Sequence, residues 1–259
     1  MRAINKIDFK LLEAEHAAQR VIDEFGICSP EHIRVRDIAV AKGATVIEKP
    51  VPGAAAGLVT LGEQAVISVS PEGNEARKRF SIAHELGHLV MNHVASIQKI
   101  CTDEDMLNWY QSSLETQANF FASELILPAQ LVAPYSDTGE VSFDLIKEIA
   151  KKFRASLTAT AIKFVRLCPE PCAVVYSTNG VIKWSYKSSE WWPFIRSGQQ
   201  LDERTLAHDF FAGHDMDSEA QEIDADAWVE DMKLHEVVEH SVGSSQYGFV
   251  LSLLWIKPE

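Results

Sequence analysis

The stretch from Arg79 to His93, RFSIAHELGHLVMNH, constrains this chain more than any other part of it. Two histidines, His84 and His88, stand four residues apart among apolar residues that recur at helical spacing. On an α-helix this spacing puts both imidazoles on one face, where they can bind the same metal ion. Glu85 lies beside the first ligand and is placed to take a proton from water at the metal. The stretch therefore predicts a helix over about 76–95 that carries two metal ligands.

A third ligand is needed, because a catalytic zinc site uses three protein ligands and keeps one open position. The segment ETQANFFASELILP predicts a second helix, ended by Pro128, with Glu115 in an apolar setting. A buried carboxylate is costly unless it binds a cation, so Glu115 is the expected third ligand. The alternative is that Glu115 is a solvated helix residue. Asn119, one turn later, suits an outer role in which its carbonyl accepts a hydrogen bond from a ligating histidine.

The sequence indicates the roles of other residues near the motif less directly. Gly87 removes a side chain and so predicts that another segment approaches this helix closely. A third histidine six residues after His88 would complete a different type of zinc site, but Val94 stands there. His93 is expected on the wrong side of the helix to be a ligand. It remains, with Tyr110, a candidate for stabilising an oxyanion.

Composition limits the class of protein. The chain has 259 residues, 46% hydrophobic and 24% charged, which is typical of a globular protein with one or two cores. No apolar run is long enough to span a membrane, and the N-terminus lacks a signal-peptide core, so we expect a cytoplasmic protein without membrane contact. Four cysteines are too few and too scattered for a disulfide framework.

The charge is distributed unevenly and indicates a domain boundary. Residues 1–169 carry 18 basic and 21 acidic side chains, whereas residues 170–259 carry 6 and 16. The change falls beside the proline-rich sequence CPEPC, residues 168–172. The acidic C-terminal part is poorly suited to broad contact with nucleic acid, because phosphates require a basic surface.

The pattern of the chain predicts an α+β fold in three parts. Residues 1–140 are expected to form the metal-binding domain, 141–168 a helix-turn-helix-like segment, and 169–259 a smaller α/β domain. The first part includes a β-hairpin turning at Gly62 and a strand over 65–70. The third part includes a hairpin turning at Asn179-Gly180 and strands within DADAWVED and YGFVLSLLWIK.

The two-helix segment carries a local excess of positive charge. Its residues nearest the turn, Lys147, Lys151, Lys152 and Arg154, are candidates for nucleic-acid contact. A solvated basic helix face is the commoner explanation of such a pattern.

The blocks RFSIAHELGH and ETQANFFASELILP, with the basic two-helix segment after them, resemble the ImmA/IrrE family of metallopeptidases over residues 10–167. The resemblance implies a zincin-like domain in an intracellular bacterial or phage-borne endopeptidase. Family members cleave or otherwise remove helix-turn-helix repressors and so switch on DNA-damage, mobile-element or phage-defence genes. Some relatives carry a GAF-like sensor domain where residues 170–259 stand.

The resemblance also implies a mechanism. Zn²⁺ would sit on His84, His88 and Glu115, and Glu85 would act first as general base and then as general acid. Mn²⁺ or Fe²⁺ would also suit these nitrogen and oxygen ligands, although zinc is preferred. The strand over 65–70 is expected either to align the substrate peptide as an edge strand or to lie inside the sheet.

Two further hypotheses concern control and alternative roles. Cys101 lies between the two ligand-bearing segments, so its thiolate could occupy the open metal position in a latent state. An activating nucleic acid or a small ligand of the C-terminal domain would release it. The alternatives to a peptidase are a DNA-binding regulator with a structural metal site and an anti-repressor that binds its partner without cutting it.

Overall fold

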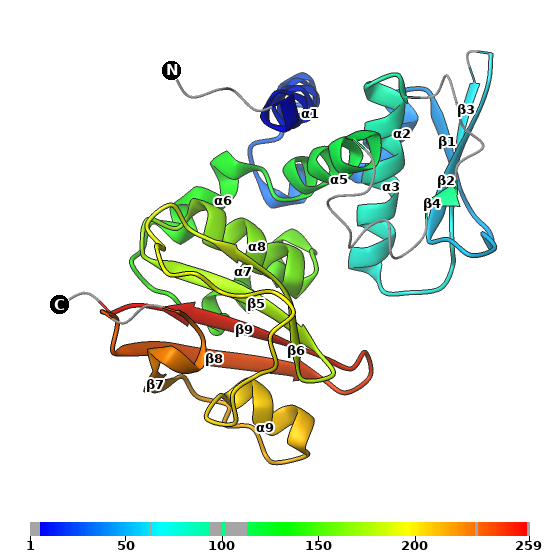
Figure 1. Ribbon diagram of the computed structural model, residues 1–259. Helices are drawn as coiled ribbons and strands as arrows, with labels where there is room; N and C mark the ends of the chain where they lie inside the picture. The colour runs from blue at the N-terminus through cyan, green and yellow to red at the C-terminus, as the bar shows by residue number, and fades with distance from the viewer. Residues whose placement is uncertain (1–5, 63, 94–99, 102–112, 231–232, 258–259) are drawn as a thin grey trace. The chain divides into compact units, whose positions relative to one another are not determined.

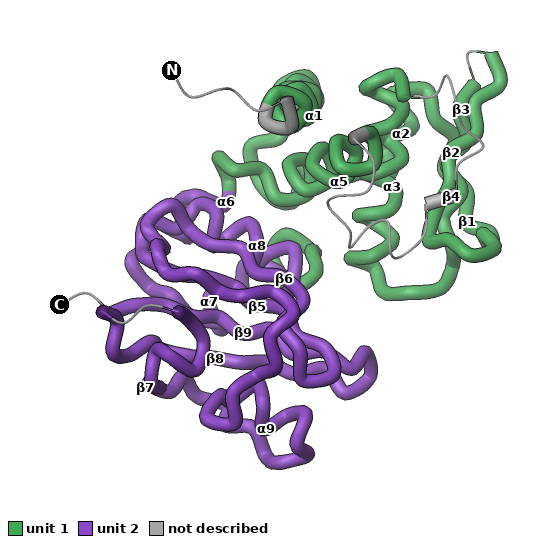
Figure 2. Tube along the Cα trace, in the orientation of Figure 1, with its two compact units in different colours: residues 1–131, 151–156 green, residues 132–150, 157–259 purple. Residues whose placement is uncertain are grey.

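The structure is a computed structural model that describes residues 6–62, 64–93, 100–101, 113–230 and 233–257. The chain divides into two compact units, shown in Figure 2. Unit 1 comprises residues 1–131 and 151–156, and unit 2 comprises residues 132–150 and 157–259. Both units contain helices and strands, so the predicted α+β class is confirmed.

Unit 1 contains the predicted hairpin and the two predicted ligand-bearing helices among its elements. Its elements are α1 (Lys6–Glu24), η1 (Pro30–His32), α2 (Val35–Ala41), β1 (Ala44–Glu48), β2 (Ala56–Leu61), β3 (Gln64–Val69), α3 (Glu75–Val90), β4 (Ile100–Cys101) and α5 (Ser113–Ile126). Helix α1 ends before Gly26, which adopts a left-handed conformation with φ 59°. The Ile27 N–H then donates to the Ile22 carbonyl at 2.9 Å, which satisfies a carbonyl at the helix end.

The sheet of unit 1 has the strand order β1-β3-β2-β4. Strands β2 and β3 form the predicted antiparallel hairpin, and β1 lies parallel to β3 on its other side. Strand β3 is therefore interior, with its main-chain groups used by two neighbours. Of the two alternatives left open for residues 65–70, the interior strand is the one observed, because β1 pairs with the edge of β3 that β2 leaves free.

The helices of unit 1 lie in layers on this sheet (Figure 1). Helix α3 packs against β2 and β3 on one side and against α5 on the other, and α1 packs against α5. The two ligand-bearing helices are thus held face to face.

Unit 2 is built on a five-stranded antiparallel sheet with the order β6-β5-β9-β8-β7. Its elements, some of which begin or end in unit 1, are α6 (Ala129–Ser136), α7 (Phe143–Phe153), α8 (Leu157–Leu167), β5 (Cys172–Thr178), β6 (Val181–Lys187), α9 (Leu206–Ala212), β7 (Gln221–Asp224), η3 (Ala225–Ala227), β8 (Glu236–Ser244) and β9 (Phe249–Trp255). The predicted hairpin turning at Asn179-Gly180 joins β5 and β6, and both turn residues have positive φ.

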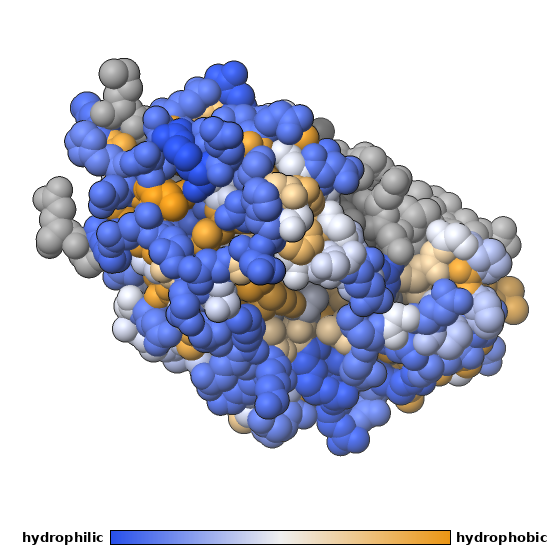
Figure 3. Space-filling view, turned by 90° about the horizontal axis from the view of Figure 1, so that it is seen from below, coloured by the Kyte–Doolittle hydropathy of each residue, from blue (hydrophilic) through white to orange (hydrophobic). Residues whose placement is uncertain are grey.

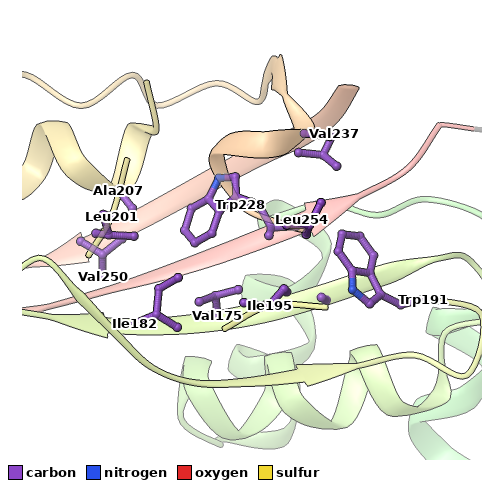
Figure 4. Packing of buried hydrophobic residues seen from close by; sticks show 13 residues of the cluster. Val175, Ile182, Trp191, Ile195, Leu201, Ala207, Trp228, Val237, Val250 and Leu254 are labelled. Atoms are coloured by element: carbon purple, nitrogen blue, oxygen red, sulfur yellow. The ribbon is translucent and has the colours of Figure 1, made fainter. Parts of the chain in front are cut away.

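One face of this sheet packs under the segment between β6 and β8. Figure 4 shows its core, in which Trp191 and Trp228 lie over the strand residues Val175, Val250 and Leu254. Both tryptophans are almost fully buried, so the tryptophan-rich sequence builds a core here. The GAF-like identity of this region stays a prediction.

Helix α8 packs against β5 and β6, and residues from Thr160 to Val165 are buried along it. Its Lys163 is only 4% exposed. Helices α7 and α8 are joined by a short turn at Arg154, as predicted. The second of them, α8, packs its buried side against the sheet of unit 2. This packing explains why α8 groups with unit 2, while the predicted domain boundaries at 140 and 168 stay a prediction.

One strand was placed wrongly from the sequence. DADAWVED was expected to be a strand, but β7 ends at its first residue, Asp224. The next three residues, Ala225–Ala227, form a short 3-10 helix that precedes Trp228. Its two alanines, Ala225 and Ala227, are both buried.

Hydrophilic residues dominate the face shown in Figure 3, and hydrophobic residues gather there only in small groups. Among the described helices, none is long and apolar enough to cross a membrane.

Candidate metal centre

Helix α3 begins at a cap that the sequence encodes. The Asn74 side chain accepts a hydrogen bond from the Arg77 N–H at 2.9 Å, which satisfies one of the free N–H groups of the first turn. From there the helix runs to Val90 and buries His84, Glu85 and His88. The motif predicted from its spacing therefore lies on a buried helical face.

The three predicted ligands converge on one point. His84 Nε2 lies 3.1 Å from His88 Nε2, and Glu115 Oε2 lies 3.2 Å from the first and 3.3 Å from the second. All three side chains are at most 5% exposed. Among the described residues they form a group of ligand atoms that could hold one metal ion.

These separations match a zinc ion in size. Bonds of about 2.0–2.1 Å in a tetrahedral arrangement put neighbouring ligand atoms about 3.3 Å apart. Two imidazole nitrogens and a carboxylate oxygen gathered this closely are a donor set that a divalent cation would satisfy. The residues present therefore fit a divalent metal ion.

Electrostatics favour the ionised form of the third ligand. Burial by itself would raise the pKa of Glu115, but hydrogen bonds with His84 and His88 lower that pKa far below its usual range. The carboxylate is thus negative before any metal arrives. A negative oxygen among two imidazoles gives a site that attracts a divalent cation.

Asn119 occupies the place expected from its spacing in α5. Its Oδ1 lies 2.9 Å from His84 Nδ1. With a metal ion bound at His84 Nε2, Nδ1 would carry the proton and donate it to the Asn119 oxygen. This bond fixes the tautomer and the ring orientation of His84.

The close approach predicted from Gly87 is present. A Cβ atom at Gly87 would lie 2.9 Å from Cδ1 of Phe121, a residue of α5. The missing side chain thus lets α5 pack directly on α3. That contact sets the distance between the helix that carries the histidines and the helix that carries Glu115.

His93 was misplaced from the sequence. Helix α3 ends at Val90, and Asn92 adopts a left-handed conformation with φ 54°, so the expected helix over 76–95 is too long. The chain turns back there, and His93 Nδ1 comes within 3.1 Å of His88 Nδ1. Burial lowers the pKa of His93 to about 4, so this imidazole is neutral at pH 7. The one sequence signal was an asparagine, a residue that tolerates this conformation, directly before His93.

The remaining predicted residues are less completely placed. The backbone of Cys101 lies in β4 opposite Ala56, but its side chain, like Tyr110, lies outside the described residues. The proposed thiolate lock stays a prediction.

The four basic residues lie on α7 and the following turn, where Lys147, Lys151 and Lys152 are exposed. Lys147 forms an ion pair with Asp144, and Arg154 forms one with Glu75. Their contact with nucleic acid stays a prediction.

Comparisons with known proteins agree with this centre. Residues 39–164 match the family model Peptidase_M78, described as an IrrE N-terminal-like domain. No curated protein matches the chain. A solved structure described as a Mycobacterium tuberculosis transcriptional regulator is similar over 94% of this chain and 76% of that chain, with a TM-score of 0.64 and 15% identity. That likeness concerns the fold alone.

Proposed function

We propose that this chain is a zinc-dependent endopeptidase that cleaves a helix-turn-helix repressor. Its residues 39–164 match the IrrE N-terminal-like domain of the Peptidase_M78 family. The observation that carries the proposal is the convergence of His84, His88 and Glu115, with Glu85 buried on the same helix as the two histidines. A structural zinc site usually has four protein ligands, whereas three leave a position open for chemistry.

Each residue has a distinct part in the proposed reaction. A divalent ion held by the three ligands supplies Lewis-acid chemistry, polarising a peptide carbonyl and lowering the pKa of water. Glu85, adjacent to the ligand His84 in α3, takes the proton from the attacking water and later delivers it to the leaving amine. Asn119 keeps His84 oriented through the 2.9 Å contact.

The substrate class is proposed from the family resemblance. A repressor is basic where it meets DNA, and residues 170–259 carry 16 acidic against 6 basic side chains. Complementary charge would steer such a partner to this chain. We therefore expect cleavage at one or a few sites of a repressor encoded beside this chain, without general proteolysis.

The test is a cleavage assay with that repressor and the purified, zinc-loaded chain. The parent should cut it, and Glu85→Gln should retain the metal but lose cutting by at least about 100-fold, because the general base is removed. Glu75→Gln, at an exposed position of the same helix, is the matched control and should cut normally.

The same assay separates the alternatives. Release of intact repressor from its DNA, equally by the parent and by Glu85→Gln, would replace the peptidase with a non-cutting anti-repressor. Direct binding of operator DNA by this chain, without cleavage, would favour a regulator with a structural metal.

A further inference from the structure

The two histidine ligands differ in what holds their outer nitrogens. His84 Nδ1 meets an amide oxygen, that of Asn119, at 2.9 Å. His88 Nδ1 instead meets another imidazole, His93 Nδ1, at 3.1 Å. The His93 ring packs edge-on to His88, with 5.2 Å between ring centroids.

The direction of this hydrogen bond follows from the ligand geometry. His88 Nε2 lies at the centre shared with His84 and Glu115, so with a metal ion bound there the proton of a neutral His88 would sit on Nδ1. That N–H donates to His93 Nδ1, which must be unprotonated to accept it. The proton of neutral His93 is then on Nε2, so His93 can donate a further hydrogen bond.

Gln117 of α5 continues the connection. Its side chain lies close enough to His93 to act on the pKa of that imidazole, and its amide oxygen is the atom that can accept from the ring. The Gln117 amide nitrogen donates to the Lys10 carbonyl at 3.2 Å and to Glu13 Oε2 at 3.3 Å. Both acceptors belong to α1, and Gln117 itself is buried.

We propose that His93 and Gln117 are positioning residues of the metal centre, joining the ligand His88 to helix α1 by a series of side-chain contacts. The proposal rests on the metal centre of the proposed function. It assigns a role to α1, which lies outside the matched residues 39–164. The series fixes the tautomer and orientation of His88 and raises its basicity, as outer partners of metal-ligating histidines do.

The local structure supports this role. A helix continued past Val90 would carry His93 away from His88, so the left-handed turn at Asn92 is what brings the two rings together. Asparagine is favoured over other side chains in this conformation. The end of α3 is therefore formed by the same few residues that support the ligand.

The first test compares three variants at one position of the full-length chain. His93→Phe keeps an aromatic ring but has no acceptor, whereas His93→Gln offers an amide oxygen like that of Asn119, and His93→Ala has neither. Affinity for Zn²⁺ is measured by competition with a chelator, and Co²⁺ by its d–d absorption, both without substrate. His93→Phe and His93→Ala should bind about 10–100-fold more weakly with an altered Co²⁺ spectrum, and His93→Gln should recover most of the loss.

The second test concerns α1. Gln117→Leu removes the amide, and with it the hydrogen bonds to Lys10 and Glu13 and the contact with His93, while keeping a similar volume. It should also weaken metal binding and shift the Co²⁺ spectrum. Gln19→Leu, on the exposed side of α1, is the matched control and should bind as the parent does. Melting of the metal-free proteins identifies a temperature at which all variants are folded, and affinities are compared there.

Parent-like affinity and spectrum in His93→Phe, or a His93→Gln variant as weak as His93→Phe, would overturn the positioning role. These readouts do not depend on cleavage. The positioning role of His93 and Gln117 can therefore be disproved while the proposed peptidase activity is retained. Loss of all metal binding by the parent would instead overturn the proposed function itself.

Discussion

Glu115 and Glu239 are buried carboxylates that are stabilised in different ways. Glu115 faces two imidazoles and the centre between them. Glu239, in β8 of unit 2, is fully buried and faces only hydrogen-bond donors. Four groups donate to its two oxygens at 2.7–3.1 Å: Leu206 N, Ala207 N, Trp228 Nε1 and Ser241 Oγ. The first carboxylate is arranged for a cation, whereas the second fastens α9 and Trp228 to the sheet.

Glu239→Gln should destabilise unit 2 by about 1–3 kcal/mol, because one oxygen becomes an NH₂ group that faces N–H donors in a buried place. Denaturant unfolding followed by tryptophan fluorescence measures this, since Trp228 lies in the cluster. Glu236→Gln, exposed at the start of the same strand, is the control and should change stability little.

The cost of Glu239→Gln should also depend on pH. Burial raises the pKa of Glu239 despite the hydrogen bonds that lower it. The folded state therefore binds the proton more tightly than the unfolded state, and this contribution is full below the unfolded pKa of about 4.3. It is lost as pH rises through the folded pKa. The stability difference between parent and variant should grow on acidification from pH 7 towards pH 5; a difference that shrinks would contradict the assigned shift.

At the scale of elements, the contact between α3 and α5 builds the centre. The spacing of His84 and His88 and the apolar setting of Glu115 predicted both helices, because each motif lies within one helix and follows its period. His93 escaped prediction because its position depends on where α3 ends. The spacing of residues in the sequence predicts positions only for as long as the helix continues. The left-handed conformation of Asn92 is what shows that α3 has ended before His93.

Gly87→Ala tests that contact. The added methyl would meet Phe121 at 2.9 Å and push α5 away from α3, at a cost of about 1–3 kcal/mol in stability. Because α5 carries Glu115, zinc affinity should fall as well, as measured by competition with a chelator. Gly57→Ala in β2 is the matched control, since its Cβ would meet nothing within 4 Å. Equal zinc affinities in the two variants would show that the helix contact does not set the ligand distances.

At the scale of the whole molecule, patterns local in sequence were predicted and pairings distant in sequence were not. The hairpins at Gly62 and Asn179-Gly180 follow from their turns. Strand β8 was not predicted, because its buried residues include Glu239, His240 and Ser241. Polar residues at these positions interrupt the apolar pattern by which a core strand is recognised in a sequence. The burial of α8 also depends on strands that follow it in the chain.

In the proposed centre His84, His88 and Glu115 together hold one metal ion, and Glu85 does not bind it. The direct measurement is metal content by mass spectrometry after dialysis of zinc-loaded protein against metal-free buffer. The parent and Glu85→Gln should each retain about one Zn²⁺ per chain, whereas Glu115→Gln and His84→Ala should lose it. Full retention by Glu115→Gln would contradict the account, because the centre described here would then not be the one that binds the metal.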